Sequence, residues 1–111
     1  GKVREGFLFP YHNWRSRIAQ LRFVQDIPMK PKDYSYPLMQ EIENSLQKFQ
    51  KNQTLICWGE KDFCFNDGFL KTWIKHYPNA EVHKISNGGH YVLEDGGEKI
   101  LILIRDFLLR N

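Results

Sequence analysis

An aspartate and a histidine stand at positions in this sequence where the side chains of a parallel sheet do chemistry. Asp62 follows the apolar run Thr54–Trp58, and His90 follows a second strand-like run, Ala80–Ile85. Catalytic groups of open parallel sheets gather just beyond the carboxyl ends of the strands. A carboxylate bonded to one imidazole nitrogen fixes the tautomer and stabilises the imidazolium, so the other nitrogen can act as a general base toward a nucleophile or a water molecule. We therefore predict that Asp62 and His90 are the acid and the histidine of a catalytic site.

The elements around these two residues form a predicted strand–helix–strand unit. The continuous apolar run Thr54–Trp58 is typical of a strand buried on both faces, as parallel strands are. Asn66 or Asp67 can cap a helix that ends at Tyr77, and Ala80–Ile85 alternates between apolar and polar residues as a second strand does. The unit has the length that a right-handed parallel crossover requires. It would place the two candidate residues at the same edge of the sheet.

The histidine is followed by a predicted helix that glycine interrupts. Gly88-Gly89 allow a sharp bend just before the imidazole. The segment Tyr91–Asp95 can form one turn, which Gly96-Gly97 separates from a last helix that begins at Glu98 and ends near Arg110. Because this helix is apolar nearly all round, we expect it to be buried on more than one side.

Two more helices are predicted upstream of the first strand. Asn13 is a suitable cap for an amphipathic helix that ends near residue 25. Pro37 stands in the first turn of a second helix, which reaches Phe49 and is expected to cover a sheet. The aromatic run Phe7–Tyr11 is broken by a proline, which predicts an irregular connecting segment.

Other polar and aromatic residues carry weaker signals. A lone aspartate after a glycine is most often a turn former, so the assignment of Asp62 depends on its place beside a second strand end. Glu94 and Asp95 are expected to be helix-start or surface acids, because a carboxylate one turn after the histidine is poorly placed to orient it. Surface or packing positions are predicted for His12, His76 and His83, and core positions for Trp58, Phe63 and Phe65, of which either phenylalanine could also line an apolar pocket.

Composition and charge describe an ordinary globular segment. The chain has 111 residues, 41% apolar and 26% charged, and its net charge of +3 comes from basic residues scattered among acids, which argues against nucleic-acid binding. Neither a leader sequence nor an apolar run near the roughly 20 residues of a membrane span is recognised, so a cytoplasmic protein is predicted. Cys57 and Cys64 lack metal-binding spacing and are expected to be reduced thiols, and no metal or cofactor is predicted. Because the sequence opens with Gly1, as if within a polypeptide, we expect an N-terminal part to be missing.

Three motifs together resemble a known family. The segments Trp58–Asp62, Tyr77–Val82 and Asn87–Tyr91 are similar to the C-terminal third of α/β-hydrolase-fold enzymes, most like the haloalkane dehalogenase and epoxide hydrolase branch. In that family the catalytic acid follows the seventh strand and the histidine follows the eighth. The resemblance therefore implies an α/β fold, with Asp62 as the triad acid and His90 as the catalytic base.

The resemblance also implies how the chain is divided and what it acts on. Residues 1–36 would be the end of a helical cap and the return to the core, and residues 37–111 the C-terminal part of the core domain. The substrate would be a small apolar halide, epoxide or ester, with water as co-substrate. The nucleophile, Asp or Ser, would lie in the missing N-terminal part. Gly96-Gly97 departs from the family, which often has Ala-Pro there.

Two alternatives remain beside the dehalogenase-like enzyme. The motifs recur in epoxide hydrolases, esterases and lactonases, so any of these activities fits the residues. In a different class, the chain would be a non-catalytic module that docks onto a partner chain through the helix Trp14–Gln25 and the apolar last helix. In either case we expect the segment alone to be inactive and to fold poorly, because large side chains left in water each forfeit roughly 1.5–3 kcal/mol of burial.

Overall fold

The computed structural model describes residues 1–110, whose contacts divide the chain into two compact units. The first unit is Gly1–Asn44, and the second begins at Ser45. Each unit is described separately below. The predicted boundary between cap and core after residue 36 stays a prediction.

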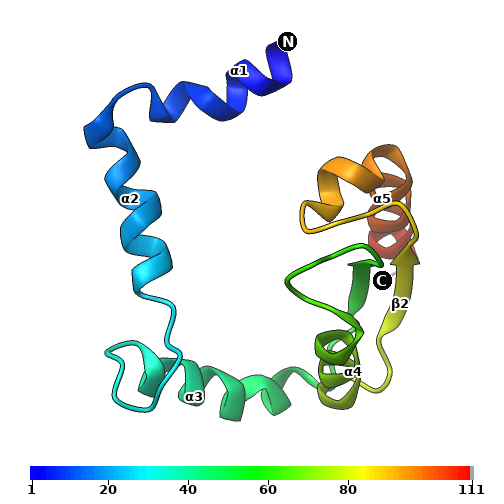
Figure 1. The fold of residues 1–111 in the computed structure, drawn as a ribbon. Coiled ribbons are helices and arrows are strands. Elements are labelled where there is room, and N and C mark those ends of the chain that lie inside the picture. Colours follow the sequence, from blue (N-terminus) through cyan, green and yellow to red (C-terminus); the bar gives the residue numbers. More distant parts are fainter. Residues whose placement is uncertain (111) are drawn as a thin grey trace. The chain divides into compact units, whose positions relative to one another are not determined.

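The second unit contains a parallel pair of strands with helices on both faces (Figure 1). After a 3₁₀ turn, Leu46–Phe49, the order is β1 (Leu55–Gly59), α4 (Asp67–His76), β2 (Glu81–Ile85) and α5 (Val92–Arg110). The strands run parallel, with Leu55 opposite Glu81 and Gly59 opposite Ile85. This confirms the predicted strand–helix–strand unit and its parallel strands.

The core of this unit is small and lies on both sides of the strands. Ile85 of β2 and Ile100 of α5 are 0% and 1% exposed on one face, and Leu70 of α4 is 2% exposed. Successive strand residues point to opposite faces, and Lys84, the neighbour of Ile85, forms an ion pair of 2.9 Å with Asp67 of α4. The helices α4 and α5 therefore cover opposite faces of the sheet.

The last helix is broken where the sequence predicts. Within α5, Gly97 has non-helical angles, φ 40° and ψ −119°, so a first turn is separated from the longer part of the helix. The expectation that this helix is buried on more than one side is wrong, since Leu101, Leu108 and Leu109 are 66–78% exposed. The reason is that two short strands cover only one side of a helix of this length.

The first unit is helical. It contains α1 (Lys2–Leu8), a 3₁₀ helix (Phe9–Tyr11), α2 (Trp14–Gln25) and α3 (Tyr36–Ser45). The predicted cap of α2 is confirmed, because the Asn13 side chain accepts a hydrogen bond of 2.9 Å from the amide of Ser16, whose hydroxyl in turn accepts one from the Asn13 amide. The irregular segment predicted for Phe7–Tyr11 is wrong. Its proline lies in the first turn of the 3₁₀ helix, where a missing N–H costs no hydrogen bond.

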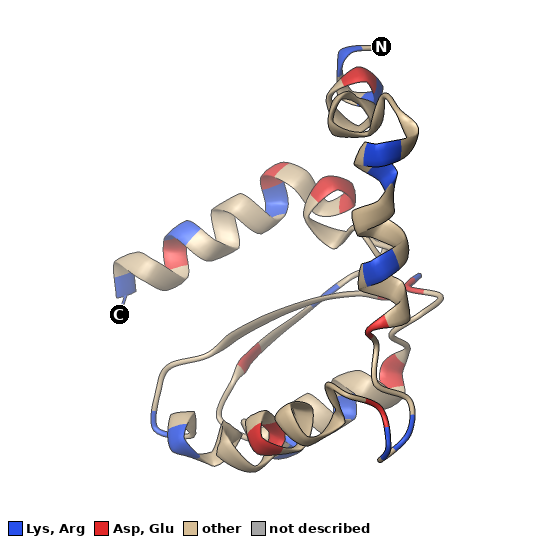
Figure 2. Ribbon diagram, turned by 90° about the vertical axis from the view of Figure 1, so that its left-hand side faces the viewer, with Lys and Arg blue, Asp and Glu red and all other residues tan. Residues whose placement is uncertain are grey.

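The second predicted helix, α3, is shorter and more exposed than the sequence suggests. The second predicted helix ends at Ser45 instead of Phe49, and Leu38 and Ile42 are about half exposed, so its role in covering a sheet stays a prediction. In α5, both acidic and basic residues lie along the helix, with acids in its first turn and Arg110 in its last (Figure 2). Within the described residues, no helix combines the length and the apolar character needed to cross a membrane.

Candidate active site

The loop after β1 is folded around the carboxylate of Asp62. The Asp62 amide donates to the carbonyl of Gly59 over 3.3 Å, which turns the chain at the strand end. One oxygen of the Asp62 side chain accepts hydrogen bonds from the amides of Cys64, at 2.8 Å, and Phe65, at 2.9 Å. The indole N–H of Trp58 donates to the Phe65 carbonyl at 3.0 Å and ties the far end of the loop to the strand. The carboxylate therefore has a fixed orientation.

Backbone hydrogen bonds join this loop to the loop after β2. The Glu60 amide donates to the carbonyl of Ile85, at 3.1 Å, and the Lys61 amide donates to the carbonyl of Gly88, at 2.8 Å. Both bonds continue the strand pairing beyond the last residues of β1 and β2. The two loops therefore leave the sheet side by side.

Glycine at position 59 is required by the closeness of these loops. A Cβ atom built on Gly59 would lie 2.7 Å from the carbonyl oxygen of Gly88 and nearer still to that of Gly89. Both atoms belong to the backbone and cannot move aside as a flexible side chain can. Gly59 is thus a packing requirement for placing the histidine loop against β1.

Asp62 and His90 meet where the two loops lie together. The His90 Nδ1 atom is 3.2 Å from each carboxylate oxygen of Asp62. The Asp62 side chain is 10% exposed and that of His90 is 34% exposed, so the acid is shielded while the imidazole remains accessible. The structure brings together both residues that the sequence singled out. With Nδ1 occupied by the acid, Nε2 is the nitrogen left for chemistry.

The surroundings of Asp62 keep it ionised. Partial burial acts to raise the pKa of its carboxyl, yet this pKa lies below its ordinary value. The cause is the set of hydrogen bonds from the amides of Phe65 and Cys64 and the contact with His90, all of which favour the carboxylate. An ionised acid is the form that accepts a proton-bearing Nδ1 and fixes the tautomer of the histidine.

Aromatic rings surround the imidazole. The ring centroids of Phe63, Phe65 and Tyr91 lie 5.4–5.7 Å from that of His90. The prediction of a core position is wrong for Phe63 and Phe65, which are 88% and 43% exposed, because both lie in the loop after Asp62. The alternative prediction, that either phenylalanine lines an apolar pocket, stays open for the surface next to His90.

Asp95 has a role that the sequence did not indicate. It lies at the start of α5, as predicted, but one of its carboxylate oxygens also accepts a hydrogen bond of 2.7 Å from the amide of Gly89, the residue before the histidine. The amide of the Asn87 side chain donates to the Asp95 carbonyl at 3.1 Å. The sequence carries no clear signal for this contact, because Asp95 follows Gly89 by six residues and the bond depends on the angle at which α5 begins.

A second histidine also has an acidic partner. The His83 Nε2 atom lies 2.7 Å from a carboxylate oxygen of Glu81, which also binds Arg110 at 2.8 Å. The hydrogen bond from His83 lowers the pKa of Glu81 most; partial burial acts to raise it, and Arg110 lowers it further. His83 and Glu81 meet because residues two apart on a strand share a face. His12 contacts the Phe9 carbonyl and His76 the ring of Trp73.

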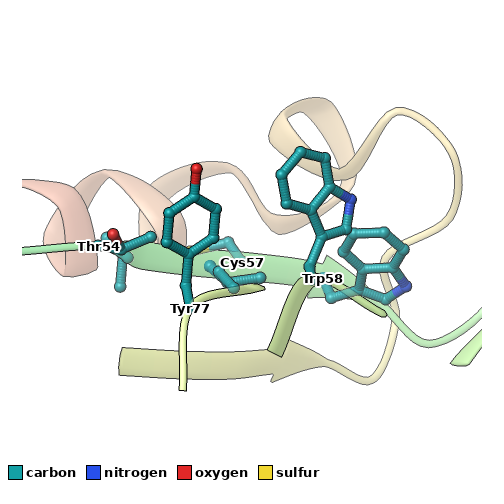
Figure 3. A pocket seen from close by; sticks show the side chains of 7 residues that line it. Thr54, Cys57, Trp58 and Tyr77 are labelled. Carbon is teal, nitrogen blue, oxygen red and sulfur yellow. The ribbon is translucent and has the colours of Figure 1, made fainter. Parts of the chain in front are cut away.

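An apolar groove lies along β1 on the side of α4 (Figure 3). It has a volume of about 320 Å³ and is lined by Thr54–Trp58 together with Trp73 and Tyr77. Within residues 1–110, no cluster of three or more His, Cys, Asp or Glu side chains is arranged to hold a metal ion. In this part of the chain, the side chain that is hydrogen-bonded to the His90 ring is that of Asp62.

The chain is similar to part of two curated enzymes. It is 47% identical over 106 residues to a cis-3-alkyl-4-alkyloxetan-2-one decarboxylase of Shewanella oneidensis, a match that takes 96% of this chain and 33% of the relative. It is 40% identical over 109 residues to a protein of the same name from Xanthomonas campestris pv. campestris, covering 98% of this chain and 36% of the relative. The chain spans about a third of the length of these relatives. No family model and no solved structure matches it.

Proposed function

We propose that this chain is the C-terminal part of an α/β-hydrolase-fold enzyme that acts on oxetan-2-ones, the four-membered cyclic esters named for its relatives, and releases carbon dioxide. The observation that carries the proposal is the contact of His90 with Asp62 beyond the ends of two parallel strands. The name of the relatives supports the substrate class. An oxetan-2-one is a cyclic ester, and esters are one of the three substrate classes that the family resemblance implies.

The reaction balances without an oxidant, a reductant or water. Loss of carbon dioxide from an oxetan-2-one breaks the bond from the ring oxygen to C4 and the bond from the carbonyl carbon to C3. The electron pair of the second bond forms the double bond between C3 and C4, so the products are an alkene and carbon dioxide. Negative charge develops on the carboxylate oxygens as the first bond breaks. A hydrogen-bond donor or cation at this position lowers the barrier.

The two residues have distinct roles in this proposal. Asp62 accepts the Nδ1 proton of His90 and stabilises the imidazolium. His90 uses Nε2 as a base toward the nucleophile, or as a donor to the carboxylate once it is protonated. Because Nε2 lies on the accessible side of the ring, both functions can reach a bound substrate. An aspartate outside this chain fits this reaction if it attacks C4 as the ring oxygen leaves, and is expelled from C4 when the bond from the carbonyl carbon to C3 breaks and its electron pair forms the double bond. A serine, deprotonated by His90, would instead attack the carbonyl carbon and open the ring to an acyl-enzyme, which water hydrolyses to the 3-hydroxy acid of a lactonase.

Features of the sheet support the completion of this site by additional sequence. Within the described residues, β1 pairs only with β2, and an apolar groove runs along β1 (Figure 3). The outward face of α5 is apolar and exposed. Relatives about three times as long contain enough additional chain to cover these surfaces. The proposed enzyme therefore places further strands beside β1.

A hybrid enzyme tests the proposal directly. In this hybrid, the chain replaces the matching third of the Shewanella oneidensis relative, with which it shares 47% identity. It is supplied with a cis-3,4-dialkyl oxetan-2-one, a haloalkane, an epoxide and a nitrophenyl ester, and the products are identified by mass spectrometry. Alkene and carbon dioxide are expected from the oxetan-2-one. A 3-hydroxy acid would instead indicate a lactonase, and turnover of the haloalkane or epoxide alone would indicate the dehalogenase or epoxide hydrolase branch.

Variants of the hybrid test the roles of the residues. His90→Ala and Asp62→Asn are expected to reduce kcat by roughly 10²–10⁴-fold, the range that general acid–base groups contribute. His83→Ala is the matched control, because it removes a second histidine that also has a carboxylate partner on the same sheet. Equal losses for His83→Ala and His90→Ala would overturn the assignment of the site. A folded hybrid without any turnover would favour the non-catalytic module.

A further inference from the structure

The backbone just before His90 is held from two directions. The Lys61 amide, in the loop that carries the acid, donates to the carbonyl of Gly88 at 2.8 Å. The carboxylate of Asp95, at the start of α5, accepts a hydrogen bond from the amide of Gly89 at 2.7 Å. A short hydrogen bond to a carboxylate is stronger than one between neutral groups. The histidine therefore follows two residues that are each fixed by a separate element.

We propose that Asp95 is a positioning residue for His90: by holding the Gly89 amide, it fixes the direction in which the imidazole leaves the loop and so keeps Nδ1 against Asp62. The inference rests on the proposed function, in which this contact makes His90 a base. Asp95 does not touch the ring itself. It acts through the backbone of the residue before the histidine.

The carboxylate of Asp95 is itself held in place. Its own amide donates to the carbonyl of Tyr91 at 3.0 Å, which sets Asp95 in the first turn of α5. The side chain of Asn87 donates to its carbonyl at 3.1 Å, so the turn is also tied to the start of the loop. The break at Gly97 separates this turn from the rest of α5. Hydrogen bonds thus tie Asp95, in the first turn of α5, to both Asn87 and Gly89 of the histidine loop.

A simpler role, as an acid at a helix start, can be separated from the proposed one. Acids in the first turn of a helix stabilise it through the helix dipole. Glu94 is in the same turn, and within the described residues its carboxylate makes no hydrogen bond or ion pair. Glu94→Ala therefore removes the same charge from the same turn without freeing the Gly89 amide. It is the matched control for Asp95→Ala.

The first test uses nuclear magnetic resonance on the hybrid enzyme, after thermal unfolding has shown that each variant is folded. The exchange rate of the Gly89 amide and the nitrogen shifts of the His90 ring are compared among the parent, Asp95→Ala, Asp95→Asn and Glu94→Ala. In Asp95→Ala, the Gly89 amide is expected to exchange roughly 10-fold faster, and the ratio of the Nδ1–H to the Nε2–H tautomer of His90 to fall roughly 2- to 10-fold, as for one lost hydrogen bond. Asp95→Asn keeps an acceptor oxygen and should restore most of both signals, while Glu94→Ala should match the parent.

The second test measures catalysis in the hybrid enzyme. Asp95→Ala should lower kcat and leave KM nearly unchanged, because the substrate still binds while the base is misaligned; Glu94→Ala should change neither. The proposal is overturned if the Gly89 amide is unprotected in the folded parent hybrid, or if Asp95→Ala leaves the His90 tautomer ratio as it is. The nitrogen shifts of the His90 ring are measured without substrate, so they do not depend on catalysis. A failure of the proposed decarboxylase activity is therefore distinguishable from a failure of this inference.

Discussion

Replacing Gly59 by alanine is the sharpest test of how the loop that carries Asp62 and the loop that carries His90 pack together. The added Cβ would overlap the backbone carbonyls of Gly88 and Gly89, with the Gly88 oxygen at only 2.7 Å. The histidine loop would have to move away from β1, which strains the bond from the Lys61 amide to Gly88. His90 follows directly on this loop, so the displacement would also separate it from Asp62.

The magnitude follows from three contributions. Overpacking costs about 1–3 kcal/mol, a weakened hydrogen bond costs about 1 kcal/mol, and the stiffer unfolded chain returns about 0.4–1 kcal/mol. The net destabilisation is about 1–3 kcal/mol, which corresponds to a fall of about 2–10 °C in the unfolding midpoint. A displacement of about 1 Å at a catalytic base can cost about 100-fold in rate, so activity should fall further than stability.

The assay is thermal unfolding and turnover of the hybrid enzyme. Gly6→Ala is the control, because a Cβ at Gly6 has no atom within 4 Å and the position lies inside α1. This control should gain about 0.5–1 kcal/mol of helix stability and keep its activity. If Gly59→Ala unfolds at the parent's temperature and turns over at the parent's rate, the loops are not packed as described and the reasoning about the catalytic pair fails with them.

Two further predictions concern titratable groups. Because the pKa of Asp62 is lower in the folded chain than in the unfolded one, its contribution to stability is complete above the unfolded pKa and is lost as the pH falls through the folded pKa; the amides of Cys64 and Phe65 should lose protection from exchange over this acidic range, whereas Asp62→Asn should show no such step. Burial raises the pKa of the Cys57 thiol, with Glu81 adding to the effect, while Cys64 is exposed. Iodoacetamide should therefore modify Cys64 at least about 10-fold faster than Cys57, as followed by mass spectrometry, and equal rates would contradict the described burial.

The pairing of the strands and the contact of Asp62 with His90 were predictable because their signals are local. The apolar runs end at glycines, and parallel strands bring their carboxyl ends to one edge, so Asp62 and His90 had to meet if both runs formed strands. The interruption of the last helix was equally predictable, since Gly97 adopts a positive φ that other residues avoid.

The parts that could not be predicted depend on geometry that sequence spacing does not encode. Phe63 was expected in the core, but the direction of the turn after Asp62 exposes it. The contact of Asp95 with Gly89 depends on the angle at which α5 begins. The exposure of Leu108 and its neighbours on α5 depends on which surfaces the rest of the chain covers, and an apolar pattern records only that a residue is suited to burial.

Apart from the contact of Asp62 with His90 itself, two hydrogen bonds between backbone atoms join the loop after β1 to the end of β2 and the loop that follows it, from Glu60 to Ile85 and from Lys61 to Gly88. Such bonds do not depend on the identity of the side chains at these positions, glycine at 59 and 88 excepted. Exposed side chains next to the imidazole, such as Phe63 and Tyr91, can therefore change during evolution while Asp62 and His90 remain in contact. A protein built in this way can acquire new substrates by exchanging the residues around its catalytic pair, without rebuilding the pair itself.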